Sequence, residues 1–236
     1  LRRGVPAVHQ QYDTETAILA GDTLYAKAFE LMSSTGADPA NGTKAVHRLA
    51  TTCTKICEGQ ALDVEFERQQ EVLPVEYLEM VELKTAVLYG AAAATTAMLM
   101  DASDKTIQAM YRYGIDAGCA FQIQDDVLDL TVPSEELGKQ RGSDLVEDKE
   151  TLITLHARKH GTDVDALVPE TRVSEVSEAD IDAAVESLRS TGSITYASEK
   201  ATELVENAKG HLTVLPDNKP RSLLADIADF FITRQY

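Results

Sequence analysis

The sequence lacks tryptophan and has little glycine and cysteine, with 13 glycines and three cysteines in 236 residues. Scarce glycine favours helix. Three cysteines cannot all pair and the chain is not small, so we expect no disulfide framework and a reducing, cytoplasmic environment. Cys53 and Cys57 are one helical turn apart, but no second pair completes a zinc site. We therefore expect both to be small core residues.

Basic residues are also few. The chain has 22 lysines and arginines against 39 aspartates and glutamates, a net charge of −17. Such a charge repels nucleic acid and anionic membrane surfaces, so we expect neither as a partner. Halophilic proteins use high negative charge to stay soluble in salt, and the composition therefore raises the hypothesis of a salt-loving source.

No apolar run is long enough to cross a bilayer. The longest uncharged stretch, Thr85–Met100, has 16 residues and contains three threonines. A membrane span needs roughly 20 mainly apolar residues. We therefore expect a buried helix here and no stable membrane insertion. No signal peptide is visible.

Helical periodicity runs through the chain, and we find neither strand alternation nor a fixed-period repeat. The length suffices for one large domain or two small ones. We predict an all-α, single-domain helical bundle over residues 1–236, with a site built from inward side chains of facing helices. The expected helices cover residues 14–33, 43–69, 74–100, 104–130, 149–160, 179–191, 193–215 and 221–234. The expected apolar face of the second comprises Val46, Leu49, Cys53, Ile56 and Cys57.

One helical stretch, from Tyr111 to Asp129, carries carboxylates where an apolar seam is expected. At helical spacing, one stripe holds Gly118, Gln122, Asp125 and Asp129. Neighbouring buried carboxylates repel each other unless a positive charge lies between them, and Mg²⁺ is the simplest such charge. The alternative is an exposed acidic patch in an acidic protein.

Three sets of basic residues occur in this otherwise acidic sequence. Lys84 is the last charge before the long uncharged run, so it either snorkels to solvent or meets an anion in a cavity. A glycine-containing loop with Lys139 and Lys149 follows the carboxylate helix directly. Arg2 and Arg3 precede a glycine and suit phosphate recognition, although a solvated loop is the simpler interpretation.

These features occur in an order that resembles the trans isoprenyl diphosphate synthases, the polyprenyl synthetase family. The resemblance rests on Arg2-Arg3-Gly4, Lys84-Thr85-Ala86, the stretch from Phe121 to Asp129, and Gly138-Lys139 followed by Gly142-Ser143-Asp144 and Lys149. Gly59-Gln60 with Asp63 and the closing Ala228–Arg234 segment are similar too. The overall character resembles short-chain enzymes that make geranylgeranyl or farnesyl diphosphate, with a halophilic archaeon as the suggested source.

The resemblance implies the isoprenoid synthase fold around a central cavity, a homodimer, and condensation of isopentenyl diphosphate with an allylic diphosphate. It implies that Asp125 and Asp129 hold Mg²⁺ and that Asp126 supports them. Lys84, Lys139 and Lys149 would bind the allylic diphosphate, while Thr85 and Gln122 would face the reacting carbons. Arg2 would assist the allylic diphosphate and Arg3 the isopentenyl one.

The family carries another aspartate-rich motif just before the Arg-Arg-Gly, and these 236 residues do not contain it. We therefore expect the sequence to lack the N-terminal helices of its domain, with that motif lying upstream of Leu1. Three alternatives stay open: a non-catalytic regulatory subunit of a prenyl synthase, another Mg²⁺-diphosphate enzyme such as a terpene cyclase, and a plain helical bundle with an acidic surface.

Overall fold

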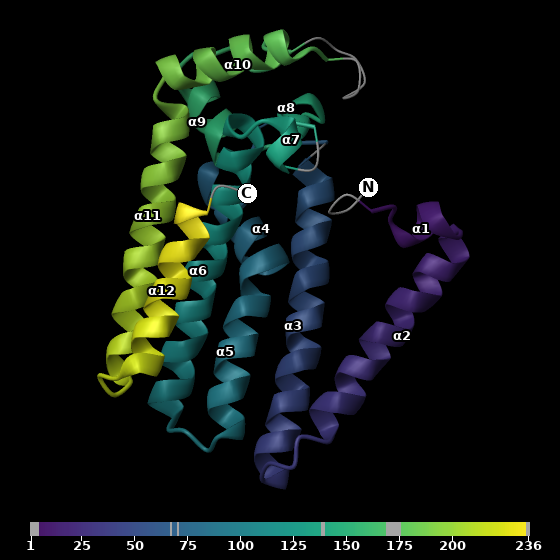
Figure 1. Ribbon diagram of the computed structural model, residues 1–236, viewed down its shortest axis with the longest axis vertical. Helices are drawn as coiled ribbons and strands as arrows, with labels where there is room; N and C mark the ends of the chain where they lie inside the picture. The colour runs from purple at the N-terminus through teal and green to yellow at the C-terminus, as the bar shows by residue number, and fades with distance from the viewer. Residues whose placement is uncertain (1–4, 67, 70, 138–139, 169–175, 235–236) are drawn as a thin grey trace.

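The computed structural model describes residues 5–66, 68–69, 71–137, 140–168 and 176–234, and Arg2, Arg3 and Lys139 lie outside this part. Within it the protein is all-α, as predicted, and contains no strand. Long helices run side by side in a bundle, α10 lies across one end of it, and α2 diverges at one side (Figure 1). No helix in the described part is both long and apolar enough to span a membrane.

The elements follow the predicted order with shifted ends. They are α1 (Val8–Gln11), α2 (Thr14–Ser33), α3 (Pro39–Phe66), α4 (Pro74–Val81), the π-helical turn η1 (Glu82–Ala86), α5 (Val87–Leu99), α6 (Asp104–Thr131), α7 (Ser134–Leu137), α8 (Ser143–Val146), α9 (Leu152–Lys159), α10 (Glu178–Ser190), α11 (Ser193–His211), the 3₁₀ turn η3 (Leu212–Val214) and α12 (Lys219–Thr233).

Local sequence explains several helix starts. Asp13 caps α2 by accepting a hydrogen bond from the Thr16 amide at 2.6 Å, so the predicted start is confirmed. A capping box at Ser177 begins α10, because its hydroxyl and the Asp180 carboxylate satisfy each other's backbone amides.

The predicted apolar face of α3 was wrong. The buried residues of α3 recur every seventh position, at Ala45, Thr52, Gly59 and Phe66. The five expected face residues are half-buried or exposed, and Cys57 is exposed rather than in the core. Small side chains let α3 approach the core closely. α2, which packs against α3, has no buried residue itself and leaves the expected face partly exposed.

The core is built around α6, which packs mainly against α5 and α11. Close backbone approach makes this packing possible: a Cβ on Gly114 would lie 2.5 Å from the Cα of Gly90 on α5. The predicted helix over residues 74–100 is interrupted by η1. Insertions of this kind are frequent at functional sites, and this one carries Lys84 and Thr85.

Candidate active site

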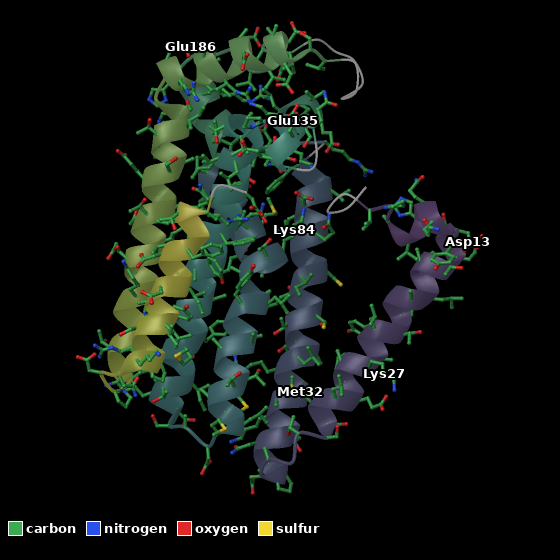
Figure 2. The ribbon with its side chains drawn as sticks, in the orientation of Figure 1. Asp13, Lys27, Met32, Lys84, Glu135 and Glu186 are labelled. Carbon is green, nitrogen blue, oxygen red and sulfur yellow. The ribbon has the colours of Figure 1, made fainter. Side chains whose placement is uncertain are left out.

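A cavity opens where α3, α4, η1, α6 and the segment from α8 to the start of α9 meet. Its polar lining residues are Asp63, Tyr77, Lys84, Thr85, Gln122, Asp126, Asp144, Lys149, Glu150 and Thr151. Figure 2 shows Lys84 between α3 and the neighbouring helices of the bundle. Carboxylates and lysines thus face one another across a small space, and this arrangement suits a ligand that carries both metal ions and negative charge.

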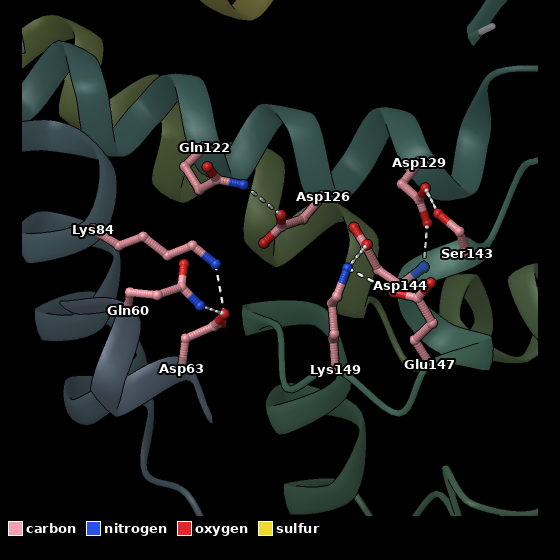
Figure 3. A network of polar contacts seen from close by, with 10 residues as sticks. All are labelled: Gln60, Asp63, Lys84, Gln122, Asp126, Asp129, Ser143, Asp144, Glu147 and Lys149. Atoms are coloured by element: carbon pink, nitrogen blue, oxygen red, sulfur yellow. Dashed lines mark hydrogen bonds and ion pairs between the residues drawn. The ribbon is translucent and has the colours of Figure 1, made fainter. Parts of the chain in front are cut away.

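The α6 wall of the cavity consists of Gln122 and Asp126, one helical turn apart (Figure 3). The Gln122 amide donates to Asp126 Oδ1 at 3.1 Å, and the Tyr77 hydroxyl donates to Asp126 Oδ2 at 2.5 Å. Burial raises the pKa of Asp126 to about 7; the two hydrogen bonds oppose this rise, and the charges of Asp144 and Asp125 add to it. Burial therefore disfavours the charged form of Asp126, and the two hydrogen bonds offset this only in part.

Asp125 lies on a different side of α6 and does not line the cavity. Its carboxylate forms an ion pair with Arg234, the residue that follows α12. The Arg234 guanidinium also lies over the Phe121 ring, 4.0 Å from its centroid. Asp125 therefore has a positive partner supplied by the C-terminal end of the described chain.

Asp129 is fully buried and joins α6 to the following loop. It accepts hydrogen bonds from the Ser143 hydroxyl at 2.9 Å and from the Asp144 amide at 3.1 Å. Gly142, at φ +71°, adopts the left-handed conformation that brings the chain back to this point. The predicted stripe of Gln122, Asp125 and Asp129 is thus split, with Asp126 rather than Asp125 beside Gln122 in the cavity wall.

Lys84 projects into the cavity from η1, which agrees with the second of its two interpretations, a lysine facing a cavity. Its ammonium binds Asp63 Oδ2 at 2.5 Å, and Gln60 donates to the same oxygen at 3.1 Å. The partner is on α3, because Gly59 lets that helix approach η1 closely enough to bring Asp63 within reach.

Thr85 and Lys149 complete the cavity wall. The Thr85 hydroxyl donates to Gln122 Oε1 at 3.1 Å, so both residues expected to face the reacting carbons are in contact. The Lys149 ammonium binds Asp144 at 2.8 Å and Glu147 at 2.9 Å. Burial alone would lower the pKa of Lys149, but these hydrogen bonds outweigh burial and raise it. Lys149 is therefore held as a cation at the cavity.

Comparison with known proteins identifies the family. A family model described as polyprenyl synthetase matches residues 1–188 of this chain. The chain belongs to the polyprenyl synthetase family. A geranylfarnesyl diphosphate synthase from Natronomonas pharaonis is 61% identical over 236 residues, which are 100% of this chain and 68% of that protein. A geranylgeranyl diphosphate synthase from Methanosarcina mazei is 47% identical, with 100% and 72% covered.

Solved structures agree with this membership in the polyprenyl synthetase family. The geranylgeranyl pyrophosphate synthetase from Geoglobus acetivorans superposes with a TM-score of 0.90 at 40% identity, covering 99% of this chain and 72% of that one. The corresponding synthetase from Pyrococcus horikoshii has a TM-score of 0.89 at 34% identity, also covering 99% and 72%. The predicted isoprenoid synthase fold is confirmed.

Metal ligands in this polyprenyl synthetase would be carboxylate oxygens. Within the described ranges, no three His, Cys, Asp or Glu side chains lie close enough together to hold a metal ion. The donor set still fits Mg²⁺, because four carboxylates line the cavity and the raised pKa of Asp126 shows that its negative charge lacks full compensation. A cation bound near Asp126 would supply that compensation.

Sequence reasoning missed two residues that contact the aspartates. No local pattern marks Tyr77, although it shares a predicted helix with Lys84 and lines the same cavity. Arg234 was included only because the closing Ala228–Arg234 segment resembles the family. Nothing in local spacing links it to Asp125, 109 positions earlier.

Proposed function

We propose that this protein is a prenyltransferase that condenses isopentenyl diphosphate with an allylic diphosphate. The observation that carries the proposal is the convergence of Lys84, Thr85 and Gln122 on one cavity, opposite carboxylates. Membership in the polyprenyl synthetase family supports the same reaction. The expected product is geranylgeranyl or farnesyl diphosphate, and the relative at 61% identity extends the range to geranylfarnesyl diphosphate.

In this reaction the bond between the allylic carbon and the diphosphate oxygen breaks, leaving a carbocation. The double bond of isopentenyl diphosphate attacks that cation, a proton is lost, and the chain grows by five carbons. Lys84 would exchange Asp63 for a phosphate oxygen and stabilise the leaving diphosphate. The oxygens of Thr85 and Gln122 would stabilise the positive charge on carbon.

We assign Asp125 and Asp129 as candidate Mg²⁺ ligands, with Asp126 supporting them, on the resemblance of the aspartate-rich stretch to the family. When bound, Mg²⁺ supplies charge neutralisation that makes diphosphate a better leaving group. Arg234 holds Asp125, and Ser143 with the Asp144 amide holds Asp129. These contacts hold both carboxylates in defined orientations, Asp125 outside the cavity lining and Asp129 fully buried.

The remaining substrate contacts are assigned by the same resemblance. Lys149, held as a cation beside Asp144, would bind the allylic diphosphate together with Lys139. Arg2 would assist the allylic diphosphate and Arg3 the isopentenyl one. Three of these four residues lie outside the described part of the chain.

We further propose that residues 1–236 belong to one domain of a cytoplasmic homodimer. A second copy would cover exposed apolar residues of α2, which are Ile18, Leu19, Leu24, Tyr25 and Leu31. Light scattering of the purified protein would measure the oligomeric state directly. A monomeric protein at the concentration used in the activity assay would contradict the proposed dimer. That result would have no bearing on the proposed activity.

The activity is tested with purified protein, isopentenyl diphosphate, farnesyl or geranyl diphosphate, and Mg²⁺, by identifying the elongated product. Chelator should abolish turnover and added Mg²⁺ should restore it. Asp125→Ala should lower turnover by more than ~100-fold, since even indirect metal partners cost about 10–100-fold, and helix content should survive. Asp226→Ala, an exposed aspartate on α12, is the matched control and should leave turnover unchanged.

Two results would contradict the proposal. Diphosphate release without consumption of isopentenyl diphosphate would indicate a cyclase. Wild-type protein that never elongates either allylic substrate, while folded and supplied with Mg²⁺, would indicate a non-catalytic relative.

A further inference from the structure

Tyr77 places a buried phenol in the wall of the cavity. It is the largest of the fully buried side chains, at 1% exposure, and it comes from α4. Its hydroxyl donates at 2.5 Å to Asp126 on α6, a residue 49 positions later. A buried hydroxyl bonded to a buried carboxylate is a rigid contact, because each group would lose its partner if the other moved.

Asp126 transmits this contact to Gln122. Its Oδ2 accepts from Tyr77 and its Oδ1 accepts from the Gln122 amide nitrogen, at 3.1 Å. The Gln122 amide has one NH₂ group and one oxygen, and it turns the NH₂ group towards Asp126. The Gln122 carbonyl oxygen then faces the other way, where the Thr85 hydroxyl donates to it at 3.1 Å. One chain of hydrogen bonds therefore runs from Tyr77 to Thr85.

We propose that Tyr77 and Asp126 are positioning residues that fix the orientation of the Gln122 amide, so that its oxygen and the Thr85 hydroxyl face the reacting carbons. This inference rests on the proposed prenyl transfer. Lys84 and Lys149 make their ion pairs with other residues, Asp63, Asp144 and Glu147. Tyr77 should therefore affect the ionisation step and not the binding of the diphosphate.

Tyr77→Phe removes the hydroxyl and keeps the ring. We expect kcat to fall about 10- to 100-fold, the range typical of losing a residue that orients a metal ligand, while the allylic KM changes less than about 2-fold. Tyr113→Phe is the matched control. Tyr113 is also buried, at 6% exposure, but its hydroxyl donates to the Leu224 carbonyl at 2.8 Å, and it does not line the cavity. The control should keep kcat within about 2-fold at comparable thermal stability.

A double-mutant cycle tests whether Tyr77 acts on kcat through Gln122. If Tyr77 acts through Gln122, Tyr77→Phe should cost almost nothing further in a Gln122→Ala background. Independent losses that multiply would overturn the inference, as would equal losses in the Tyr77→Phe and Tyr113→Phe proteins. A kcat that recovers at high Mg²⁺ would also overturn it, since Tyr77 would then act through the metal.

Asp126→Asn is a second variant for the case in which Tyr77→Phe folds poorly. Its oxygen can still accept from Tyr77, but its NH₂ group would meet the NH₂ of Gln122 and force that amide to turn over. We expect a loss of kcat similar to that of Tyr77→Phe, and an unchanged kcat would reject the inference. An inactive wild-type protein would instead reject the proposed function, so the two failures are distinguishable.

Discussion

Asp125, Asp126 and Asp129 occupy three different environments within little more than one turn of one helix. Each residue turns the helix by about 100°, so adjacent aspartates face different neighbours. Asp125 forms an ion pair with Arg234. Asp126 accepts hydrogen bonds from Tyr77 and Gln122, and Asp129 accepts one from Ser143 in the following loop. The chemistry of each carboxylate is therefore set by its partner.

The pKa of Asp126 predicts a specific pH dependence of stability. Burial raises this pKa from 3.8 to about 7, so between these values the folded protein binds a proton that the unfolded chain has released. Stability should therefore fall as pH rises through this window. The contribution is on the order of 4 kcal/mol as an upper bound.

Asp126→Asn isolates this contribution, because the variant lacks the titrating group. Urea unfolding of both proteins in chelator, at pH 5 and pH 7.5, should show the variant gaining stability relative to wild type at the higher pH. A difference between the two proteins that does not change with pH would contradict the raised pKa.

Lys84→Gln tests the cation that we assign to the leaving group. The side chain of Lys84 is 34% exposed, so its loss should hardly affect folding. The allylic KM should rise and kcat should fall, together by about 10-fold or more, because hydrogen bonds to charged groups are worth about 1.5–3 kcal/mol. Steady-state kinetics measures both constants.

Lys209→Gln is the matched control for Lys84. Lys209 is 26% exposed and forms ion pairs with Glu206 and Asp229, away from the cavity. It should leave both kinetic constants unchanged. Equal effects of the two substitutions would mean that Lys84 acts only through general stability.

The contact between α3 and η1 positions the reactive lysine. A Cβ on Gly59 would lie 2.7 Å from the Leu83 carbonyl carbon and would also collide with the Lys84 amide. The obstructing atoms are backbone, which cannot rotate away. The close approach brings Asp63 on α3 to Lys84 on η1, so the packing of these two elements determines one wall of the cavity.

Gly59→Ala should therefore destabilise the fold by about 1–3 kcal/mol, as overpacking usually does, and should also lower activity by displacing Lys84. Gly210→Ala on α11 is the control. No atom lies within 4 Å of its added Cβ, and we expect up to about 1 kcal/mol of stabilisation. Thermal unfolding and activity assays check both variants. A Gly59→Ala protein with unchanged stability and activity would show that η1 can shift freely.

Charge is the dominant property of the whole molecule. A net charge of −17 makes the folded chain repel itself, and the relative at 61% identity comes from the haloarchaeon Natronomonas pharaonis. Salt at 1 M screens charges beyond about 3 Å. We therefore expect Tm to rise between 0.1 and 2 M KCl, by about 4–8 °C if screening contributes about 2 kcal/mol. An unchanged Tm would mean that repulsion is a minor contribution.

The sequence alone determined the helical class, most helix boundaries, and the family, because these depend on local patterns. Caps at Asp13 and Ser177 act within one turn of their own helices. The family resemblance rested on several motifs in order, among them Lys84-Thr85-Ala86 and the stretch from Phe121 to Asp129.

Only the tertiary structure decided which partners these residues have. Apolar periodicity predicts one face of α3, but three of its four buried residues are small ones that let its backbone approach the neighbouring elements. The partners Asp63, Tyr77 and Arg234 come from segments distant in sequence from the groups that they bind. A π-helical turn also shifts the register between Tyr77 and the residues after Lys84. Contacts across the bundle arise when helices pack, and no local pattern encodes them.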